Sequence, residues 1–168
     1  KHIDAIKYLH PNATIIALRS SRNGISVQGV RDIYHLSELD KKPDYILITN
    51  PTYLHEDAIV NCLGFGKPLM IEKPLFSDTN EKEQLLERIK RKGVPTYVAC
   101  NMRFHPSLQF LKKLIETRNL RINEVNVYCG SYLPNWRAAD NFRDCYSANA
   151  EMGGGVHLDL IHEIDFCI

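Results

Sequence analysis

Short apolar runs alternate with longer amphipathic stretches along the first two-thirds of the chain. Four of the runs are nearly continuous in apolar residues, which is typical of strands in a sheet that is covered on both faces. They occupy residues 14–19, 45–49, 69–72 and 95–100. Segments of helical period occupy residues 1–9, 57–66, 77–93 and 106–118. This alternation predicts parallel βαβ units.

The pattern changes near residue 122, where the run INEVNVYCGSYL (122–133) alternates only in part between apolar and polar residues. Partial alternation is more typical of a strand in an antiparallel sheet with one exposed face. We therefore expect a second domain to begin at about this point.

Composition removes several classes of partner. The chain has 21 basic and 20 acidic side chains and a formal net charge of +1, so neither nucleic acid nor an anionic membrane is expected to bind it. Its apolar runs are far shorter than the about 20 residues that span a bilayer, and no signal peptide is recognisable, which predicts a soluble, cytoplasmic protein. The five cysteines lack a C-x-x-C motif and are expected to be buried free thiols.

Polar residues follow each predicted strand, at the edge where ligands bind in open parallel sheets. The first strand is followed by Arg19, Ser20, Ser21 and Arg22. Guanidinium and hydroxyl groups suit the 2′-phosphate of NADP, whereas an acid at this place would suit the ribose hydroxyls of NAD. An ordinary polar turn explains the same residues equally well, so both interpretations stay open.

The later strand ends carry further candidates. The second strand is followed by the turn and helix start of Asn50, Pro51, Thr52 and His55, a common junction that says little alone. The third is followed by Glu72, Lys73 and Pro74, where a lysine points into the crevice above the sheet. The fourth is followed by Asn101, Arg103 and His105.

The last segment, EMGGGVHLDLIHEIDFCI (151–168), places acids and imidazoles among apolar residues. Such groups are costly to bury unless they are paired or used in chemistry. On one helix Asp159 and His162 would share a face, with Asp165 one turn further on. The glycines would permit a tight turn or close approach to something bulky and flat. Zinc held by His157, Asp159 and His162 is a rival with poor spacing, and a purely structural His–Asp pair is another.

Two motifs together resemble the Gfo/Idh/MocA family of nicotinamide-dependent oxidoreductases. They are the strand-terminal EKP and the later GGG-x-x-x-D...H-x-x-D pattern. KHIDAIKYL is similar to the helix after that family's glycine-rich loop, NPTYLH to its dinucleotide-contacting turn, and NMRFHP to the segment leading into its substrate domain. The SYLPNWR segment and the HEID ending look most like members that act on sugars or nucleotide sugars.

The resemblance implies an α/β fold, with a Rossmann-type doubly wound parallel sheet followed by the start of an α+β substrate domain with a mostly antiparallel sheet. Residues 1–120 would be the dinucleotide-binding Rossmann-type domain without its first strand, and residues 121–168 the truncated beginning of the substrate and oligomerisation domain. We therefore expect a fragment that lacks the glycine-rich loop. The D-x-x-H spacing of Asp159 and His162 is one residue shorter than the family's commonest D-x-x-x-H.

The implied reaction is hydride transfer between a hydroxyl-bearing carbon of a sugar or nucleotide sugar and the nicotinamide of NADP or NAD, with NADP preferred because of the RSSR turn. His162 would exchange the hydroxyl proton, Asp159 would orient it, and Lys73 would stabilise developing alkoxide charge.

The residues that the resemblance assigns to binding are more numerous. Those implied for the cofactor are Arg19, Ser20, Ser21, Arg22, Asn50, Pro51, Thr52, His55, Glu72, Lys73, Asn101 and Arg103. Those implied for the substrate are Trp136, Arg137 and His162, and no metal is expected. A non-catalytic dinucleotide-binding sensor and an NAD-recycling lyase or hydrolase remain alternatives. The full-length protein is expected to be a homo-oligomer.

Overall fold

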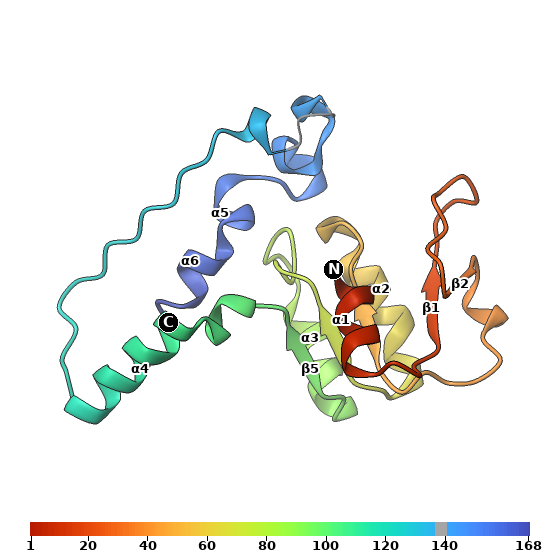
Figure 1. The fold of residues 1–168 in the computed structure, drawn as a ribbon, viewed down its shortest axis with the longest axis horizontal. Coiled ribbons are helices and arrows are strands. Elements are labelled where there is room, and N and C mark those ends of the chain that lie inside the picture. The colour runs from red at the N-terminus through yellow and green to blue at the C-terminus, as the bar shows by residue number, and fades with distance from the viewer. Residues whose placement is uncertain (137–140) are drawn as a thin grey trace. The chain divides into compact units, whose positions relative to one another are not determined.

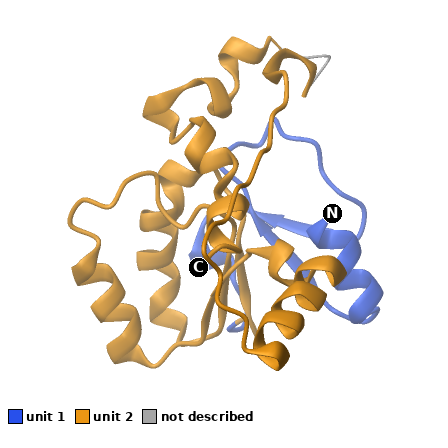
Figure 2. Cartoon of the chain, turned by 90° about the vertical axis from the view of Figure 1, so that its left-hand side faces the viewer, with its two compact units in different colours: residues 1–42 blue, residues 43–168 orange. Residues whose placement is uncertain are grey.

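The computed structural model describes residues 1–136 and 141–168. The chain forms two compact units, residues 1–42 and residues 43–168, which Figure 2 colours separately. The boundary between these units, at residues 42 and 43, differs from the domain boundary predicted after residue 120. The predicted domain boundary stays a prediction.

The first unit contains one helix and a two-stranded parallel sheet. Helix α1 is His2–Leu9, and strands β1 (Ile15–Leu18) and β2 (Val30–Ile33) pair in parallel, with Ile15 opposite Val30. A short 3₁₀ helix, η1, spans Leu36–Glu38. The predicted first strand is confirmed, whereas β2 was missed because its sequence, VRDI, carries two charged residues and gives no apolar run.

The second unit is built on a three-stranded parallel sheet. Its strands are β3 (Ile46–Ile48), β4 (Leu69–Ile71) and β5 (Thr96–Val98), in the order β3-β4-β5. These match three predicted apolar runs. The core beneath them consists of Ile48, Ile59, Leu63, Leu69, Ile71, Leu85 and Val94. Burying aliphatic side chains such as these contributes about 1.5–3 kcal/mol each.

The helices of this unit also follow the predicted pattern, with one change. Helix α2 (His55–Cys62) continues into the 3₁₀ helix η3 (Leu63–Phe65), and Gly66 ends it with a φ of 63°. Helix α4 (Pro106–Arg118) has the predicted bounds. Helix α3 begins only at Glu83 and ends at Lys92, so the predicted start at residue 77 is wrong. The Asp78 side chain accepts a hydrogen bond from the Asn80 amide at 2.9 Å, and such local bonds favour a turn over a helix.

Short elements make up much of the remaining chain. The 3₁₀ helices are η2 (Thr52–Leu54), η4 (Asn101–Phe104), η5 (Leu133–Asn135), η6 (Phe142–Asp144), η7 (Tyr146–Ala148) and η8 (Ala150–Met152). Two short α-helices close the chain, α5 (Val156–Asp159) and α6 (Ile161–Asp165). Nowhere in the described ranges is a helix long and apolar enough to cross a membrane.

Residues 122–133 were predicted as a strand, but residues 122–132 form no paired strand and Leu133 begins η5, so that prediction is wrong for the described chain. Figure 1 shows this segment as a long trace leaving α4. A strand is defined by ladder hydrogen bonds to a neighbour, and no described segment supplies that neighbour. Its side chains Ile122, Val125 and Val127 are accordingly 53%, 54% and 44% exposed.

The cysteines are all free, and only Cys100 is buried. Cys62 and Cys145 are half-buried, while Cys129 and Cys167 are exposed. The prediction of buried thiols is therefore wrong for the exposed pair. Both exposed cysteines lie in the last third of the chain, which contributes no residue to the hydrophobic core around the sheet.

Candidate active site

Lys73 lies two residues after the end of β4 and contacts the closing segment of the chain. Its Nζ donates a hydrogen bond to the backbone carbonyl of Asp159 at 2.7 Å, across 86 residues of sequence. The Lys73 amide donates to the Glu72 carboxylate at 3.1 Å, and the Lys73–Pro74 peptide bond is cis. Two of the three predicted catalytic residues therefore meet at the carboxyl edge of the sheet.

Asp159 and His162 do not lie on one helix, so the predicted shared helical face is wrong. Helix α5 ends at Asp159, and Leu160 (φ −99°, ψ 32°) breaks the backbone before α6 begins. The Asp159 carboxylate accepts a hydrogen bond from the Ser147 hydroxyl at 3.2 Å. The Nδ1 atom of His162 is buried and has no hydrogen-bond partner among the described residues. Orientation of His162 by Asp159 stays a prediction.

The glycines before α5 allow close packing within the protein. Gly153 has a φ of +78°, and a side chain there would meet the Cβ atoms of Ser77 at 2.9 Å and Thr52 at 3.3 Å. A Cβ on Gly154 would lie 2.0 Å from the backbone oxygen of Tyr146. The glycine segment therefore packs directly on the loops that follow β3 and β4. This explains the three glycines by a tight turn and a close protein contact.

The His55 side chain contacts both of those loops. Its side chain is 1% exposed, with Nε2 2.9 Å from the carbonyl of Asn50 and Nδ1 3.2 Å from the carbonyl of Leu75. A neutral imidazole has one N–H, so it donates to one of these two carbonyls, according to its tautomer. His55 therefore lies between the segments that follow β3 and β4 and contacts the backbone of both. Direct contact between His55 and a cofactor stays a prediction.

Asn50 and Thr52 lie in the segment that follows β3, at the carboxyl edge of the sheet. The Asn50 side-chain nitrogen donates to the Leu54 carbonyl at 3.2 Å, and its Oδ1 is buried with no partner in the described chain. Thr52 is buried against the glycine segment. An unpartnered acceptor is costly in a protein interior unless a ligand or water satisfies it. The amide and hydroxyl donors of a dinucleotide fit this position.

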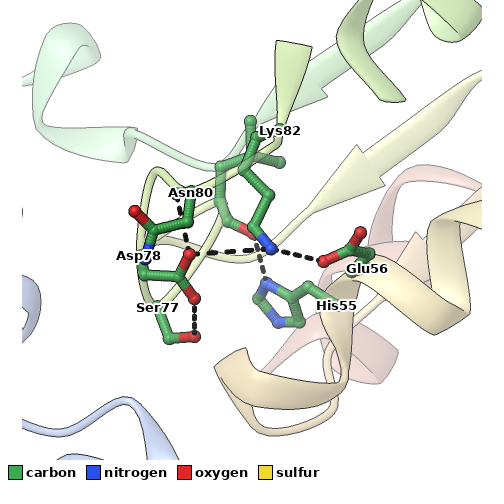
Figure 3. Close-up of polar contacts among 7 residues, drawn as sticks. His55, Glu56, Ser77, Asp78, Asn80 and Lys82 are labelled. Atoms are coloured by element: carbon green, nitrogen blue, oxygen red, sulfur yellow. Dashed lines mark hydrogen bonds and ion pairs between the residues drawn. The ribbon is translucent and has the colours of Figure 1, made fainter. Parts of the chain in front are cut away.

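A charged network fixes the loop after Lys73, and sequence analysis did not find it. Figure 3 shows Lys82 between two carboxylates, with Nζ 2.6 Å from Glu56 and 3.7 Å from Asp78. Hydrogen bonding to Glu56 raises the pKa of Lys82. The network ties the loop to the first turn of α2, next to His55. Only the fold brings Glu56 and Lys82 together, so no local sequence signal could have indicated the pair.

Arg103 was predicted to bind the cofactor, which stays a prediction; in the structure its guanidinium contacts Asp165. Nε donates to one carboxylate oxygen at 2.7 Å and Nη2 donates to the other. The hydrogen bonds from Arg103 lower the pKa of Asp165. Asn101, another predicted cofactor residue, is exposed in η4 at the same edge.

In the first unit the RSSR turn follows β1 as predicted. Arg19 Nε donates to Asp32 at 2.7 Å, while its Nη2 is buried without a partner in the part of the chain described. The Arg22 guanidinium lies 4.7 Å from the centre of the Tyr34 ring. The Ser21 hydroxyl accepts a hydrogen bond from the following turn at 3.1 Å, and Ser20 is exposed.

Asp32 was missed because the strand that carries it was missed. Hydrogen bonds from Arg19 and then Ser26 lower the pKa of Asp32. Its carboxylate is therefore already engaged within the unit.

The predicted substrate residues are less well defined. Trp136 is 43% exposed and its indole nitrogen donates to the Ser131 hydroxyl. Arg137 lies outside the described residues. Within residues 1–136 and 141–168 no group of three or more His, Cys, Asp or Glu side chains could hold a metal ion.

A comparison with models of known protein families gives a result that agrees with this parallel sheet and the lysine at its carboxyl edge. Residues 1–100 match the Gfo/Idh/MocA model, described as an oxidoreductase family with an NAD-binding Rossmann fold. The chain belongs to this family. The resemblance seen in the EKP and GGG segments and the Rossmann-type α/β fold are thereby confirmed.

Two relatives match most of this chain, but this chain covers less than half of the length of each. The chain is 30% identical over 120 residues to scyllo-inositol 2-dehydrogenase (NADP(+)) IolU of Bacillus subtilis, covering 70% of this chain and 35% of that protein. It is 25% identical over 162 residues to 2,7-anhydro-N-acetylneuraminate hydratase of Escherichia coli, covering 94% of this chain and 42% of that protein.

One solved structure covers nearly the whole chain. It is the WlbA (WbpB) dehydrogenase of Thermus thermophilus in complex with NAD and UDP-GlcNAcA, with a TM-score of 0.67 at 22% identity. The match covers 98% of this chain and 56% of that one. At this identity it supports the fold alone.

Proposed function

We propose that the protein is an NAD(P)-dependent oxidoreductase that transfers a hydride between a hydroxyl-bearing carbon of a sugar-like substrate and nicotinamide. The observation that carries the proposal is the hydrogen bond between Lys73 Nζ and the Asp159 carbonyl, at the carboxyl edge of the sheet in a chain of this family. It brings an ammonium group to the edge where ligands bind in parallel α/β folds. His162 lies three residues after Asp159 in the same closing segment.

Asn50 and Asn101, both at the carboxyl edge of the sheet, have hydrogen-bonding groups that fit a dinucleotide. The Oδ1 atom of Asn50, which has no partner among the described residues, can accept a hydrogen bond from a ligand, and the exposed Asn101 offers an amide at the same edge of the sheet. The cofactor, when bound, accepts or supplies the hydride. The protein's part is to hold the substrate oxygen and to move its proton.

Lys73 and His162 divide that task. The Lys73 ammonium hydrogen-bonds the substrate oxygen and stabilises its developing negative charge. The His162 imidazole exchanges the hydroxyl proton, because its two ring nitrogens can each hold or release a proton near neutral pH. The Asp159 carbonyl keeps Lys73 Nζ in position, and Ser147 holds the Asp159 carboxylate. Asp159 thus acts through Lys73 in this scheme.

Preference for NADP rests on the RSSR turn. Arg22 is exposed beside Tyr34, and Arg19 keeps an unpartnered Nη2, so both guanidinium groups retain donors for a 2′-phosphate. The name of the Bacillus subtilis relative specifies NADP(+). A fluorescence titration of NADPH and NADH tests this preference, and Arg22→Gln should weaken NADPH binding while leaving NADH binding unchanged. Equal loss for both cofactors would remove Arg22 from phosphate recognition.

The sugar-like substrate class is supported by the relatives' names, which include inositol and levoglucosan dehydrogenases. The full-length protein should therefore be incubated with NADP or NAD and a panel of inositols, hexoses and nucleotide sugars. Stoichiometric formation of reduced cofactor with oxidised product is the expected result. Absence of reduction for every substrate, despite cofactor binding, would favour a sensor.

The hydratase relative favours a second candidate, a lyase or hydratase that recycles its nicotinamide. It matches 94% of this chain and 42% of its own length. Product formation without net cofactor reduction would support that candidate. A cytoplasmic, homo-oligomeric protein is the proposed setting for either reaction.

A further inference from the structure

Arg103 and Asp165 form a two-pronged ion pair between segments 62 residues apart in sequence. Arg103 belongs to η4, the next element after β5, and Asp165 is the last residue of α6. The Asp165 side chain is only 10% exposed, while that of Arg103 is 57% exposed. A bidentate guanidinium–carboxylate contact fixes orientation as well as distance. The pair therefore docks α6 onto the edge of the sheet.

The carboxylate lies on the same helix as the proposed acid/base. His162 precedes Asp165 by three residues within α6, a spacing that places side chains on one face about 5–6 Å apart at Cβ. Charge on His162 acts on Asp165, as does the hydrogen bond from the Cys100 thiol. The same thiol also lies within the electrostatic influence of Arg103 and Lys73.

We propose that the Arg103–Asp165 pair is a positioning device for His162, which holds α6 in place and keeps the net charge beside the imidazole near zero. The proposal rests on the function proposed above. His162 itself is half-buried, and its Nδ1 has no described partner that would orient it directly. Its position is therefore set by the helix, and the helix is held by Asp165.

The charged groups around His162 make the effect directional. On its own helix these are Asp165 and Glu163. Arg103 contacts this helix through Asp165, and Lys73 contacts the preceding helix at the Asp159 carbonyl. Removing Arg103 leaves an unbalanced carboxylate, which favours the imidazolium form of a neighbouring histidine. Removing Asp165 leaves an unbalanced guanidinium, which disfavours it. The two halves of one pair should therefore act in opposite directions.

The test uses the full-length protein and four variants: Arg103→Gln, Asp165→Asn, the combination of both, and Arg103→Lys. The readout is the pH midpoint of the His162 ring signals by NMR, together with the pH profile of kcat/KM. We expect Arg103→Gln to move both midpoints upward and Asp165→Asn to move both downward, each by about 0.5 pH units or more. The combined variant should return close to wild type, and Arg103→Lys should stay there because the charge is retained.

A matched control is Lys112→Gln, which removes one member of the exposed Lys112–Glu116 pair on α4. It should move neither midpoint. Single variants that both shift in the same direction, or not at all, would overturn the proposal, since a merely structural pair predicts lower stability without opposite shifts. If a single variant does not fold, the charge-retaining Arg103→Lys and the combined variant still test it, and a shift of 0.5 units in either would overturn it.

The two readouts separate this inference from the proposed function. Opposite NMR shifts in a protein that never reduces a nicotinamide would support the pair and refute the dehydrogenase. Normal turnover with no shift in either readout would refute the pair and leave the dehydrogenase intact.

Discussion

Alanine substitutions at three glycines should differ sharply in stability, because the structure gives each a different reason for lacking a side chain. Gly64 has open space around its Cβ position and no positive φ. Gly66 also has open space but a φ of +63°. A Cβ on Gly154 would lie 2.0 Å from the Tyr146 oxygen and 2.8 Å from the Asn149 oxygen, both of them backbone atoms.

The magnitudes follow from those three environments. Gly64→Ala should be neutral or stabilise by up to about 1 kcal/mol, by restricting the unfolded chain. Gly66→Ala should cost about 1–2 kcal/mol, the penalty of a left-handed conformation for an L-residue. Gly154→Ala should cost about 3 kcal/mol or more, the upper end for overpacking, because backbone oxygens cannot rotate out of the way.

The assay is chemical denaturation of the three variants beside wild type, with the midpoint in urea as the measured quantity. Gly154→Ala should also weaken turnover, since the shifted backbone leads into α5, whose Asp159 carbonyl holds Lys73. Finding Gly154→Ala as stable as Gly64→Ala would refute the packing of the glycine segment described here.

Two further predictions concern His55 and the Arg103–Asp165 ion pair. His55→Ala removes the hydrogen bond from the ring to a backbone carbonyl, that of Asn50 or Leu75 according to the tautomer, and opens a cavity. One unpaired carbonyl costs about 1–3 kcal/mol and the cavity adds to it, so the unfolding free energy should fall by about 3 kcal/mol. Urea denaturation checks this, with exposed His157→Ala expected within about 0.5 kcal/mol of wild type. Arg103 lowers the pKa of Asp165 in the folded protein, so the ion pair stabilises the fold. This stability is fully present above about pH 3.9, the pKa of an Asp side chain in the unfolded chain. It is lost as the pH falls through the lower pKa that Asp165 has in the folded protein. Acid titration followed by circular dichroism should therefore show a smaller loss of stability in Asp165→Asn than in wild type, and an equal loss would contradict the assignment.

The strands and helices that sequence could predict are those whose apolar pattern is strong and local. Four apolar runs became β1, β3, β4 and β5, and α4 was found with its bounds because proline opens it. The strand β2 was missed because two of its four residues are charged. Residues 122–133 were predicted as a strand from alternation alone, yet pairing depends on a neighbour that local sequence does not specify.

The site divides in the same way. Lys73 was found because it comes shortly after a buried strand, and Asp159 because it interrupts an apolar segment. Their contact runs through the Asp159 backbone carbonyl, which no side-chain pattern reveals. The shared helical face of Asp159 and His162 failed at Leu160, where a single non-helical residue separates two short helices.

Arg103 and Asp165 were each noticed in the sequence but were not recognised as partners. Their 62-residue separation exceeds any local spacing rule, so only the fold brings them together. The same holds for Lys82 and Glu56, whose contact spans 26 residues.

The central claim is that Lys73 acts on the substrate oxygen at the edge of the sheet. The most direct measurement is single-turnover reduction of the nicotinamide cofactor by wild type and by Lys73→Met, with cofactor affinity measured in parallel by fluorescence. The account predicts at least about a 100-fold slower turnover in Lys73→Met, the scale for removing one group that stabilises developing oxyanion charge, with the protein still folded and still binding cofactor. A wild-type rate in that variant would contradict it.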